Sequence, residues 1–507
     1  MTIQALISGA GPVGLTMALE LARFGIPVRI IDKAATRTDK SKAIVIWSRT
    51  LELFDRAGLA DTLIAAGQKV DAANFIAGDK LIGRVTFDSV HSEYRFALML
   101  PQSDTERLLE EKLLKLGVTI ERDVELTSFA SHLHGVECTL HHGDGQDETF
   151  DCEWLLGCDG AHSTVRHGLD LTFEGNTLLS DWILADLHLS GYPFPESEIA
   201  TYWHEDGVLV VFPMANDRFR IVADRGLANG PMPVDPTLAQ VQEVIAKRGL
   251  ANATVSNPIW LSAFRINERK VTRYRGGRVF VLGDAAHVHS PAGGQGMNTG
   301  MQDAFNLAWK LALVCAGTCS DRILDSYSDE RSAVGQMVLE NAGRLTEVGV
   351  IKSHPLQMVR NIVGQMLLGI APFRSSMINT MSEVSIGYTN SSLNGPTAHG
   401  VHGPKPGERF APTAGETPIG AGSASRFVLA SASAGAASRL AGEFQSLVDG
   451  DIRKPPDPDG SWLVRPDGYV ACVTKRDDFV PIAAYLRKLG GPGVPLPPSL
   501  EMPGGAA

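Results

Sequence analysis

The chain has 507 residues, 44% of them hydrophobic, and its 46 Lys and Arg against 57 Asp and Glu give a net charge of −11. These charges are spread along the sequence, so no basic face or arm indicates a nucleic-acid partner. The length is sufficient for about three domains.

The six cysteines include no Cys-x-x-Cys pair, which argues against a redox dithiol and a zinc knuckle. We predict no metal site. No apolar run reaches the length of a membrane span, and the first predicted strand begins too close to Met1 to leave room for a signal peptide. We therefore expect a cytoplasmic protein with reduced thiols.

The N-terminal segment has the layout of a dinucleotide-binding unit. An apolar strand at residues 3–8 runs into Gly9-Ala10-Gly11-Pro12-Val13-Gly14, and a second apolar run at 28–31 ends at Asp32. In such a unit the first glycine makes the turn, the second lets the backbone approach a pyrophosphate, and the third lets the helix pack on the strand. Asp32 stands where a carboxylate accepts a ribose hydroxyl.

Further elements follow in chain order. Helices are predicted at 48–57 and 108–116, and short strands forming a meander at 118–120, 126–129, 136–141 and 150–156. Longer strands between about 173 and 266 predict a second sheet, at 182–189, 199–204, 208–213 and 219–223. An apolar strand at 278–283 then returns to the first domain, which is therefore discontinuous, and helices continue to about residue 380.

Two later segments place acidic residues beside glycines after apolar strands. These are Asp159-Gly160 and Gly283-Asp284, and a carboxylate at the end of a parallel strand can bond the hydroxyls of a bound sugar chain. Next comes Pro291-Ala292-Gly293-Gly294-Gln295-Gly296-Met297-Asn298, whose glycines let bare backbone lie against a flat ring. The helix that follows directs its N-terminal dipole at negative charge, which suits a reduced, anionic flavin.

With these motifs in this order, the sequence resembles the group A flavoprotein monooxygenases, in the branch of the phenol, polyketide and rifampicin hydroxylases. The resemblance implies an α/β fold: a Rossmann-like FAD-binding domain of the p-hydroxybenzoate hydroxylase type (1–172 and 267–387) with an inserted β-sheet substrate domain (173–266). A linker (388–406) then leads to a thioredoxin-like C-terminal domain (407–507). Because Cys472 has no Cys-x-x-Cys partner, we expect that domain to serve packing or a homodimer rather than disulfide reduction.

The resemblance also implies FAD and NAD(P)H as cofactors. In the family the glycine-rich unit binds the ADP half of FAD, the Asp-Gly segment serves both cofactors, and the Gly-Asp segment binds the ribityl and phosphate portion. Carried over, the expected cofactor-binding residues are Gly9, Gly11, Pro12, Val13, Gly14, Asp32, Lys33, Lys42, Gln102, Asp159, Gly160, Gly283, Asp284, Pro291, Gly294, Gly296, Met297 and Asn298. Lys42 departs from the family, where many relatives have an arginine, and lysine lacks the bidentate fork.

The reaction implied is hydroxylation of a phenolic or polyketide-type aromatic substrate. NAD(P)H reduces FAD, and O₂ then gives a flavin hydroperoxide whose distal oxygen is transferred to the ring. Since FAD occupies the single glycine-rich unit, we expect the nicotinamide to bind transiently. The substrate is expected between the flavin and the second sheet, where Tyr202, His204 and Arg220 are candidate catalytic residues. Alternation along a strand puts Tyr202 and His204 on one face.

Three alternatives remain open on this scaffold. An FAD-dependent reductase or oxidase would insert no oxygen from O₂. A flavin halogenase shares the fold, but the sequence has no Trp-x-Trp-x-Ile-Pro segment. A non-enzymatic flavin-binding module would show no NAD(P)H oxidation stimulated by a phenol.

Overall fold

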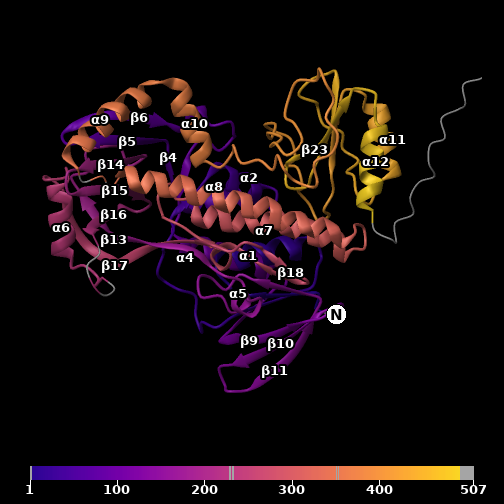
Figure 1. Cartoon of the computed structure of the whole chain (residues 1–507), viewed down its shortest axis with the longest axis horizontal. Coiled ribbons are helices and arrows are strands. Elements are labelled where there is room, and N and C mark those ends of the chain that lie inside the picture. The colour runs from indigo at the N-terminus through magenta and orange to yellow at the C-terminus, as the bar shows by residue number, and fades with distance from the viewer. Residues whose placement is uncertain (1–2, 228–229, 231–232, 350, 352, 491–507) are drawn as a thin grey trace, which may run out of the picture. The chain divides into compact units, whose positions relative to one another are not determined.

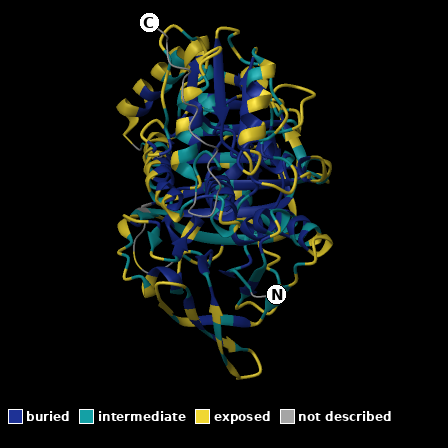
Figure 2. Cartoon of the chain, turned by 90° about the vertical axis from the view of Figure 1, so that its right-hand side faces the viewer, coloured by how far each residue is buried: buried dark blue, intermediate teal, exposed yellow. Residues whose placement is uncertain are grey.

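The computed structural model describes residues 3–490 except 228–229, 231–232, 350 and 352. By contacts the chain divides into two compact units. The larger unit comprises Met1–Phe305, Arg331–Ile386 and Pro412–Pro418, and the second comprises Asn306–Glu330, Gly387–Ala411 and Ile419–Ala507. Figure 2 shows that buried residues are concentrated in the sheets, whereas exposed residues gather on loops and the outer sides of helices.

A six-stranded sheet in the larger unit has the doubly wound arrangement predicted from the N-terminal motif. Its order is β18-β19-β12-β1-β2-β8, and every pair is parallel except β18 with β19. The strands are β1 (Ala5–Ser8), β2 (Val28–Asp32), β8 (Ile120–Arg122), β12 (Trp154–Gly157), β18 (Arg275–Gly276) and β19 (Val279–Val281). Their central residues are almost entirely apolar because both faces of a parallel sheet are covered.

Helices flank this sheet (Figure 1). They include α1 (Pro12–Arg23), α4 (Gln102–Lys115), α5 (Thr164–Gly168) and α7 (Gly296–Cys315), which begins in this unit. Helices α2 (Ser48–Asp55) and α3 (Ala60–Ala66) follow β3 (Val45–Ile46) in the chain and precede β4 (Gln68–Val70), two strands of a small sheet. The central strand of that sheet is β7 (Ala97–Met99); another small sheet is the predicted meander, β9 (Val124–Ser131), β10 (Val136–His142) and β11 (Asp147–Cys152).

The predicted single strand at 150–156 is two strands in different sheets. β11 ends at Cys152 in the meander, and β12 begins at Trp154 in the parallel sheet. The backbone N–H groups of Glu153 and Trp154 both donate to the carbonyl of Gln4, which turns the chain toward β1. The alternation of apolar residues with Asp151 and Glu153 continues through the turn, so the sequence pattern alone does not reveal the break.

The second large sheet has eight strands in the order β20-β17-β13-β16-β15-β14-β5-β6. They are β5 (Ala72–Ala77), β6 (Lys80–Thr86), β13 (Glu174–Ser190), β14 (Glu198–His204), β15 (Gly207–Met214), β16 (Arg218–Leu227), β17 (Thr254–Lys270) and β20 (His287–Val288). The sheet extends beyond the predicted insertion of 173–266, because β17 runs on to Lys270 and the hairpin of β5 and β6 adds to β14. The domain boundaries stay predictions.

The two faces of this sheet have different partners. One face packs on α6 (Leu238–Lys247) in a core that includes Tyr202, Leu209 and Ile221. On the neighbouring register positions, Trp203, Val210 and Val222 line a cavity that also receives side chains from α9 (His354–Gly369) and α10 (Ala371–Met381). α8 (Asp325–Gly349) leads into α9.

The second unit contains the C-terminal β-α-β-β-α segment. Its antiparallel sheet is β21 (Val428–Ser431), β22 (Gly460–Val464) and β23 (Val470–Lys475), with α11 (Ala434–Glu443) and α12 (Val480–Leu489). The predicted linker at 388–406 falls entirely in this unit, where Tyr388 and Leu393 are buried. Cys472 is buried and free, and burial raises the pKa of its thiol.

Candidate active site

A cavity of about 1720 Å³ within the larger unit brings together segments that are far apart in the sequence. Small-molecule sites typically measure roughly 300–1,000 Å³, so this cavity has room for a cofactor together with a substrate. Its described lining contains seven Lys or Arg residues and a single carboxylate, Asp284. This imbalance favours ligands that carry negative charge.

At one end of the cavity lies the turn between β1 and α1. Gly9 has φ +103°, and a Cβ there would lie 2.3 Å from the carbonyl oxygen of Cys158. A Cβ on Gly14 would lie 1.9 Å from the carbonyl oxygen of Gly9, so both glycines permit close packing of backbone on backbone. Neither lines the cavity, in contrast to Gly11, Pro12 and Val13.

Gly11 has the properties of a phosphate-binding position. It is the N-cap of α1, no side chain caps that helix end, and a Cβ on Gly11 would meet no atom within 4 Å. The free N–H groups at the helix start therefore face open space, and they carry the positive end of the helix dipole. These residues fit a pyrophosphate.

Asp32 and Lys33 do not line the cavity. The carboxylate of Asp32 accepts hydrogen bonds from the N–H groups of Ala10 (2.7 Å) and Ala34 (2.8 Å) and so shapes the turns on both sides. Lys33 lies 3.8 Å from a carboxylate oxygen of Glu125 in an exposed pair. Their roles as direct FAD contacts stay predictions.

Asp284 is the carboxylate best placed for a sugar chain. It follows β19 and opens into the cavity, with no hydrogen-bond partner in the described part of the chain. The protein that surrounds it raises the pKa of this carboxyl, and ligand hydroxyls that donate to it would lower that pKa. An unpaired acceptor at this point fits the ribityl hydroxyls of FAD.

The neighbouring Gly283 is held by a residue that sequence reasoning missed. Its N–H donates to Asp303 Oδ2 at 2.9 Å, and the same carboxylate pairs with His287 Nε2 (2.8 Å) and Arg331 Nε (2.6 Å). Gly283 has φ +56°, and a Cβ there would lie 2.7 Å from Val13. Asp303 lies on α7, seven residues after Gly296, and no motif in the sequence pointed to this role.

In the Asp-Gly segment after β12, the two carboxylate oxygens of Asp159 have different surroundings. Asp159 Oδ2 accepts from the N–H of Val165 at 3.1 Å, whereas Oδ1 is buried without a hydrogen-bond partner among the described residues. Burial raises the pKa of this carboxyl. Gly160, with φ +76°, lines the cavity, as does Arg166, whose guanidinium donates to the carbonyls of Ala285 (3.2 Å) and Ala161 (2.9 Å).

The glycine-rich loop before α7 also divides into lining and supporting residues. Pro291, Gly294, Gly296 and Met297 line the cavity. Asn298 is fully buried instead: its amide donates to the carbonyls of Val45 (2.8 Å) and Gly294 (3.0 Å) and accepts from the N–H of Trp47 (2.9 Å). It therefore supports the loop rather than contacting the cavity.

Lys42 and Gln102 both line the cavity. Gln102 Oε1 accepts from the N–H of Ala43 at 3.3 Å, and its amide donates to Glu106 at 2.9 Å. Burial raises the pKa of Glu106 to about 7. The predicted pair is thus brought together with the rest of the cofactor set.

On the substrate side, Arg220 lines the cavity and is 2% exposed. Its guanidinium forms a bidentate pair with Asp186, both distances 2.6 Å, and donates to the carbonyl of Lys42 at 3.1 Å. Arg220 therefore connects the eight-stranded sheet with the segment that carries Lys42. No sequence motif pointed to its partner Asp186.

Tyr202 and His204 lie outside the cavity. They share one face of β14, as alternation predicts, but the cavity lies on the other face, which carries Thr201 and Trp203. Tyr202 is buried against α6. His204, Glu205 and Asp206 are close enough together to hold a metal ion, but Lys247 Nζ already lies 2.9 Å from Asp206.

The family model described as "FAD binding domain" matches residues 2–342. The chain belongs to this family. It is 36% identical to the 6-methylpretetramide 4-monooxygenase of Streptomyces rimosus, over 96% of this chain and 93% of that protein. The rifampicin monooxygenase of Streptomyces venezuelae is 31% identical over 76% of this chain and 79% of its own length.

Solved structures agree with this assignment. The OxyS anhydrotetracycline hydroxylase from Streptomyces rimosus has a TM-score of 0.78 and 28% identity, covering 97% of this chain and all of that one. The chain is thus an FAD-dependent aromatic monooxygenase that uses NAD(P)H, and the predicted family, fold class and cofactors are confirmed. In the described residues, no helix combines the length and apolar character needed to cross a membrane.

Proposed function

We propose that this monooxygenase hydroxylates a polycyclic, polyketide-type phenol. The observation that carries the proposal is the aromatic face that the eight-stranded sheet turns toward the cavity, which includes Trp182, Trp203, Phe212, Trp260 and Phe264. Flat aromatic walls suit a flat fused-ring ligand, because offset and edge contacts between rings add to burial. The names of the relatives support the same class.

When bound, FAD accepts a hydride from NAD(P)H and activates O₂ for transfer to an aromatic carbon. The residues that would hold it are those that line the cavity at the start of α1, after β12 and β19, and at the start of α7. The N-terminal dipole of α7 would stabilise negative charge on the ring. The apolar walls exclude water from the reacting atoms.

Of the three predicted catalytic residues, Arg220 lines the cavity. We propose that it holds in place the part of the cavity wall that lies between the flavin site and the substrate. Its charge is balanced by Asp186, so it can hold the Lys42 segment without attracting a second anion. Tyr202 and His204 would act only through the sheet, since their side chains lie on the face that is turned away from the cavity.

We further propose that the protein works in the cytoplasm and that O₂ is the second substrate. Cys138, Cys152, Cys158, Cys319 and Cys472 are free thiols in the structure, which agrees with a reducing compartment. A homodimer stays a prediction.

The test is to purify the protein with FAD and to follow NAD(P)H oxidation with polycyclic phenols, simple phenols and aromatic acids under ¹⁸O₂. We expect polycyclic phenols to stimulate oxidation most strongly and one labelled oxygen to appear in the product mass. Stimulation without label would instead favour a reductase or oxidase. A preparation that is colourless and does not bind added FAD would contradict the proposal as a whole.

A further inference from the structure

Arg360 on α9 is a buried cation for which the mechanism above has no use. It lines the cavity and is 7% exposed. Its guanidinium donates to Asn361 Oδ1 at 3.1 Å and to the carbonyls of Val348 and Gly349, both at 3.4 Å. In the described part of the chain it forms no ion pair with a carboxylate.

Three other buried arginines of the larger unit do pair with a carboxylate. Arg220 pairs with Asp186 at 2.6 Å, Arg331 with Asp303 at 2.6 Å, and Arg248 with Asp224 at 3.3 Å. Burial lowers the pKa of Arg360, and no neighbouring carboxylate raises it. A desolvated guanidinium without a counter-charge is unfavourable in the free protein, and an anionic ligand would remove that cost.

The surroundings of Arg360 are those of an aromatic binding pocket. Its guanidinium lies 4.9 Å from the centre of the Trp203 ring, which in turn packs against Phe75 at 5.9 Å between ring centres. One turn away on the same side of α9 are Leu356 and Val363, which also line the cavity. In the described part of the chain, Arg360 contacts the end of α8, Asn361 and Trp203. None of these contacts involves a loop that would bind FAD.

We propose that Arg360 binds a carboxylate or a similarly charged pair of oxygens on the aromatic substrate, at a part of the ligand away from the carbon that is hydroxylated. This inference rests on the proposed substrate class. Arginine suits the task because its planar fork can bond two oxygens at once while Trp203 contacts the guanidinium face. Arg360 is thereby a residue that determines specificity, by selecting acidic polycyclic ligands over neutral ones.

The experiment compares two probes, anthraquinone-2-carboxylate and its neutral carboxamide, whose affinities for the FAD-loaded protein are measured by calorimetry. The variants are Arg360→Gln, Arg360→Lys and, as a matched control, Arg344→Gln on the exposed side of α8. We expect Arg360→Gln to weaken binding of the carboxylate by about 10- to 100-fold, with the carboxamide unchanged. Arg360→Lys should retain part of the preference, and Arg344→Gln all of it.

A different role for Arg360 would give a different result. If it only caps the C-terminal carbonyls of α8, Arg360→Gln will lower the melting temperature and leave the ratio of the two affinities unchanged, which overturns the proposal. Equal binding of both probes by the unsubstituted protein overturns it as well. Because binding is measured apart from turnover, a preference for the carboxylate without oxygen insertion would contradict the proposed function while leaving this inference intact.

Discussion

Single side chains around the cavity divide into those that hold the site and those left open to a ligand. The side chains of Asn298 and Asp303 form hydrogen bonds with the backbone and with other side chains. Asp284 and Arg360, by contrast, face the cavity without a charged partner among the described residues. Arg360 is buried, so its lack of a counter-charge is costly unless a ligand supplies one, and the Asp284 carboxylate is exposed in the cavity as an acceptor. These positions therefore indicate where ligands bind.

Glu383 is a buried residue whose charge state should affect stability. It is fully buried, accepts from Thr299 Oγ1 at 3.0 Å and from the Gln302 amide, and burial raises its pKa from 4.5 to about 8. Within this interval the unfolded chain has released the proton that the folded chain retains. The free energy of unfolding should therefore fall as pH rises, by at most about 1.4 kcal/mol per pH unit from this group.

We predict that Glu383→Gln removes this component, because the amide is neutral at every pH. Urea denaturation at several pH values between 5 and 8 should show the variant gaining stability relative to the unsubstituted protein as pH rises. Glu340→Gln, on the exposed side of α8, is the control and should show no such trend. A constant difference between the Glu383 variant and the parent would mean that this carboxyl is ionised throughout.

At the scale of elements, two glycines in the turn from β1 to α1 have different roles, one in helix packing and one in cofactor binding. Gly14 allows the helix to lie against the carbonyl of Gly9, whereas Gly11 borders open space at the helix start. Folding therefore depends on Gly14 and cofactor binding on Gly11. Substitution by alanine can distinguish them because Gly11 has φ −78°, which any residue can adopt.

We predict that Gly11→Ala leaves the melting temperature of the FAD-free protein unchanged but weakens FAD binding at least about tenfold, since the new methyl group occupies phosphate space. Gly14→Ala should instead destabilise the FAD-free protein by about 3 kcal/mol or more. Thermal melts without cofactor and fluorescence titration with FAD measure the two effects. Unchanged FAD affinity in Gly11→Ala would place the pyrophosphate elsewhere.

The sequence predicted the cofactor half of this molecule better than the substrate half. Glycine spacing and strand ends have local causes, so the loops around Gly11, Asp284 and Gly294 could be located without coordinates. The face of β14 that meets the cavity could not, because both faces are apolar: Tyr202 packs on α6 and Trp203 lines the cavity. The hairpin of β5 and β6 was missed, although the pair Gly78 and Asp79 is typical of a tight turn. Neither flanking segment alternates regularly between apolar and polar residues, so neither was recognised as a strand.

For the whole molecule, charge is unevenly distributed between surface and interior. The chain carries a net charge of −11, yet the described lining of its cavity contains seven Lys or Arg residues and one carboxylate. Such an arrangement concentrates anionic ligands at the site while the negative net charge keeps the protein soluble. It suits a monooxygenase that must hold FAD and receive NAD(P)H, both of which carry phosphates.

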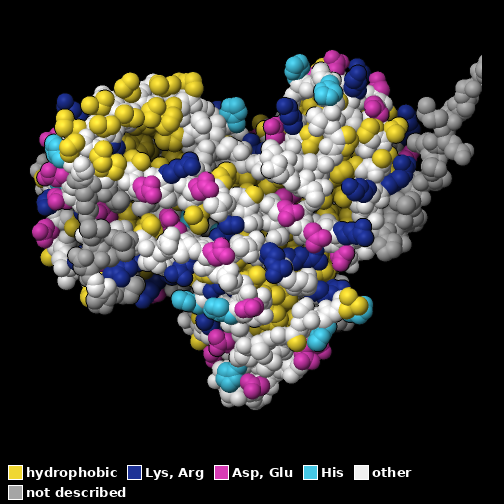
Figure 3. Space-filling view, in the orientation of Figure 1, with side chains coloured by type: hydrophobic (Ala, Val, Ile, Leu, Met, Phe, Trp, Pro, Cys, Tyr) yellow, Lys and Arg dark blue, Asp and Glu magenta, His cyan; other side chains and the backbone are white. Residues whose placement is uncertain are grey.

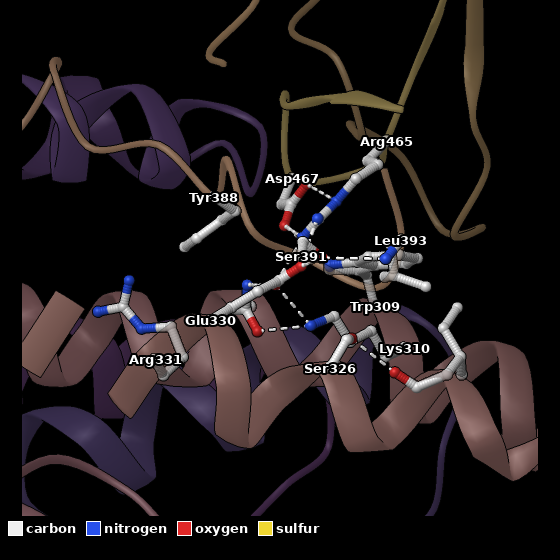
Figure 4. Close-up of polar contacts among 12 residues, drawn as sticks. Trp309, Lys310, Ser326, Glu330, Arg331, Tyr388, Ser391, Leu393, Arg465 and Asp467 are labelled. Carbon is white, nitrogen blue, oxygen red and sulfur yellow. Dashed lines mark hydrogen bonds and ion pairs between the residues drawn. The ribbon is translucent and has the colours of Figure 1, made fainter. Parts of the chain in front are cut away.

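The second unit has its own buried charges, shown in Figure 4. Glu330 is fully surrounded by donors: Arg465 at 2.6 and 3.0 Å, Lys310 at 2.8 Å, Asn306 at 2.7 Å and the Ser391 hydroxyl. Burial works against its ionisation, but Arg465 and Lys310 outweigh that effect and hold its pKa well below the usual value. The network joins the second half of α7 and the first turns of α8 to Arg465, which directly follows β22.

We predict that Glu330→Ala destabilises the protein by about 3–5 kcal/mol, because Lys310 would lose the carboxylate that it contacts and Arg465 would keep only Asp467 as a counter-charge. Denaturant unfolding followed by the fluorescence of Trp309 and Trp462, both in this unit, should show the loss. Glu443→Ala on the exposed surface of α11 should have little effect. Equal stability of the two variants would contradict a structural role for the network.

The cavity opens through an apolar rim. Leu356, Val359 and Val363 of α9 both line the cavity and are half-exposed, and Figure 3 shows hydrophobic side chains gathered around a hollow over this helix. An apolar cavity entrance favours the binding of flat, poorly soluble compounds before any specific contact forms. The alkyl tails of a detergent would compete for the same entrance. A preparation without detergent should therefore reflect the substrate preference of the enzyme better than one purified in micelles.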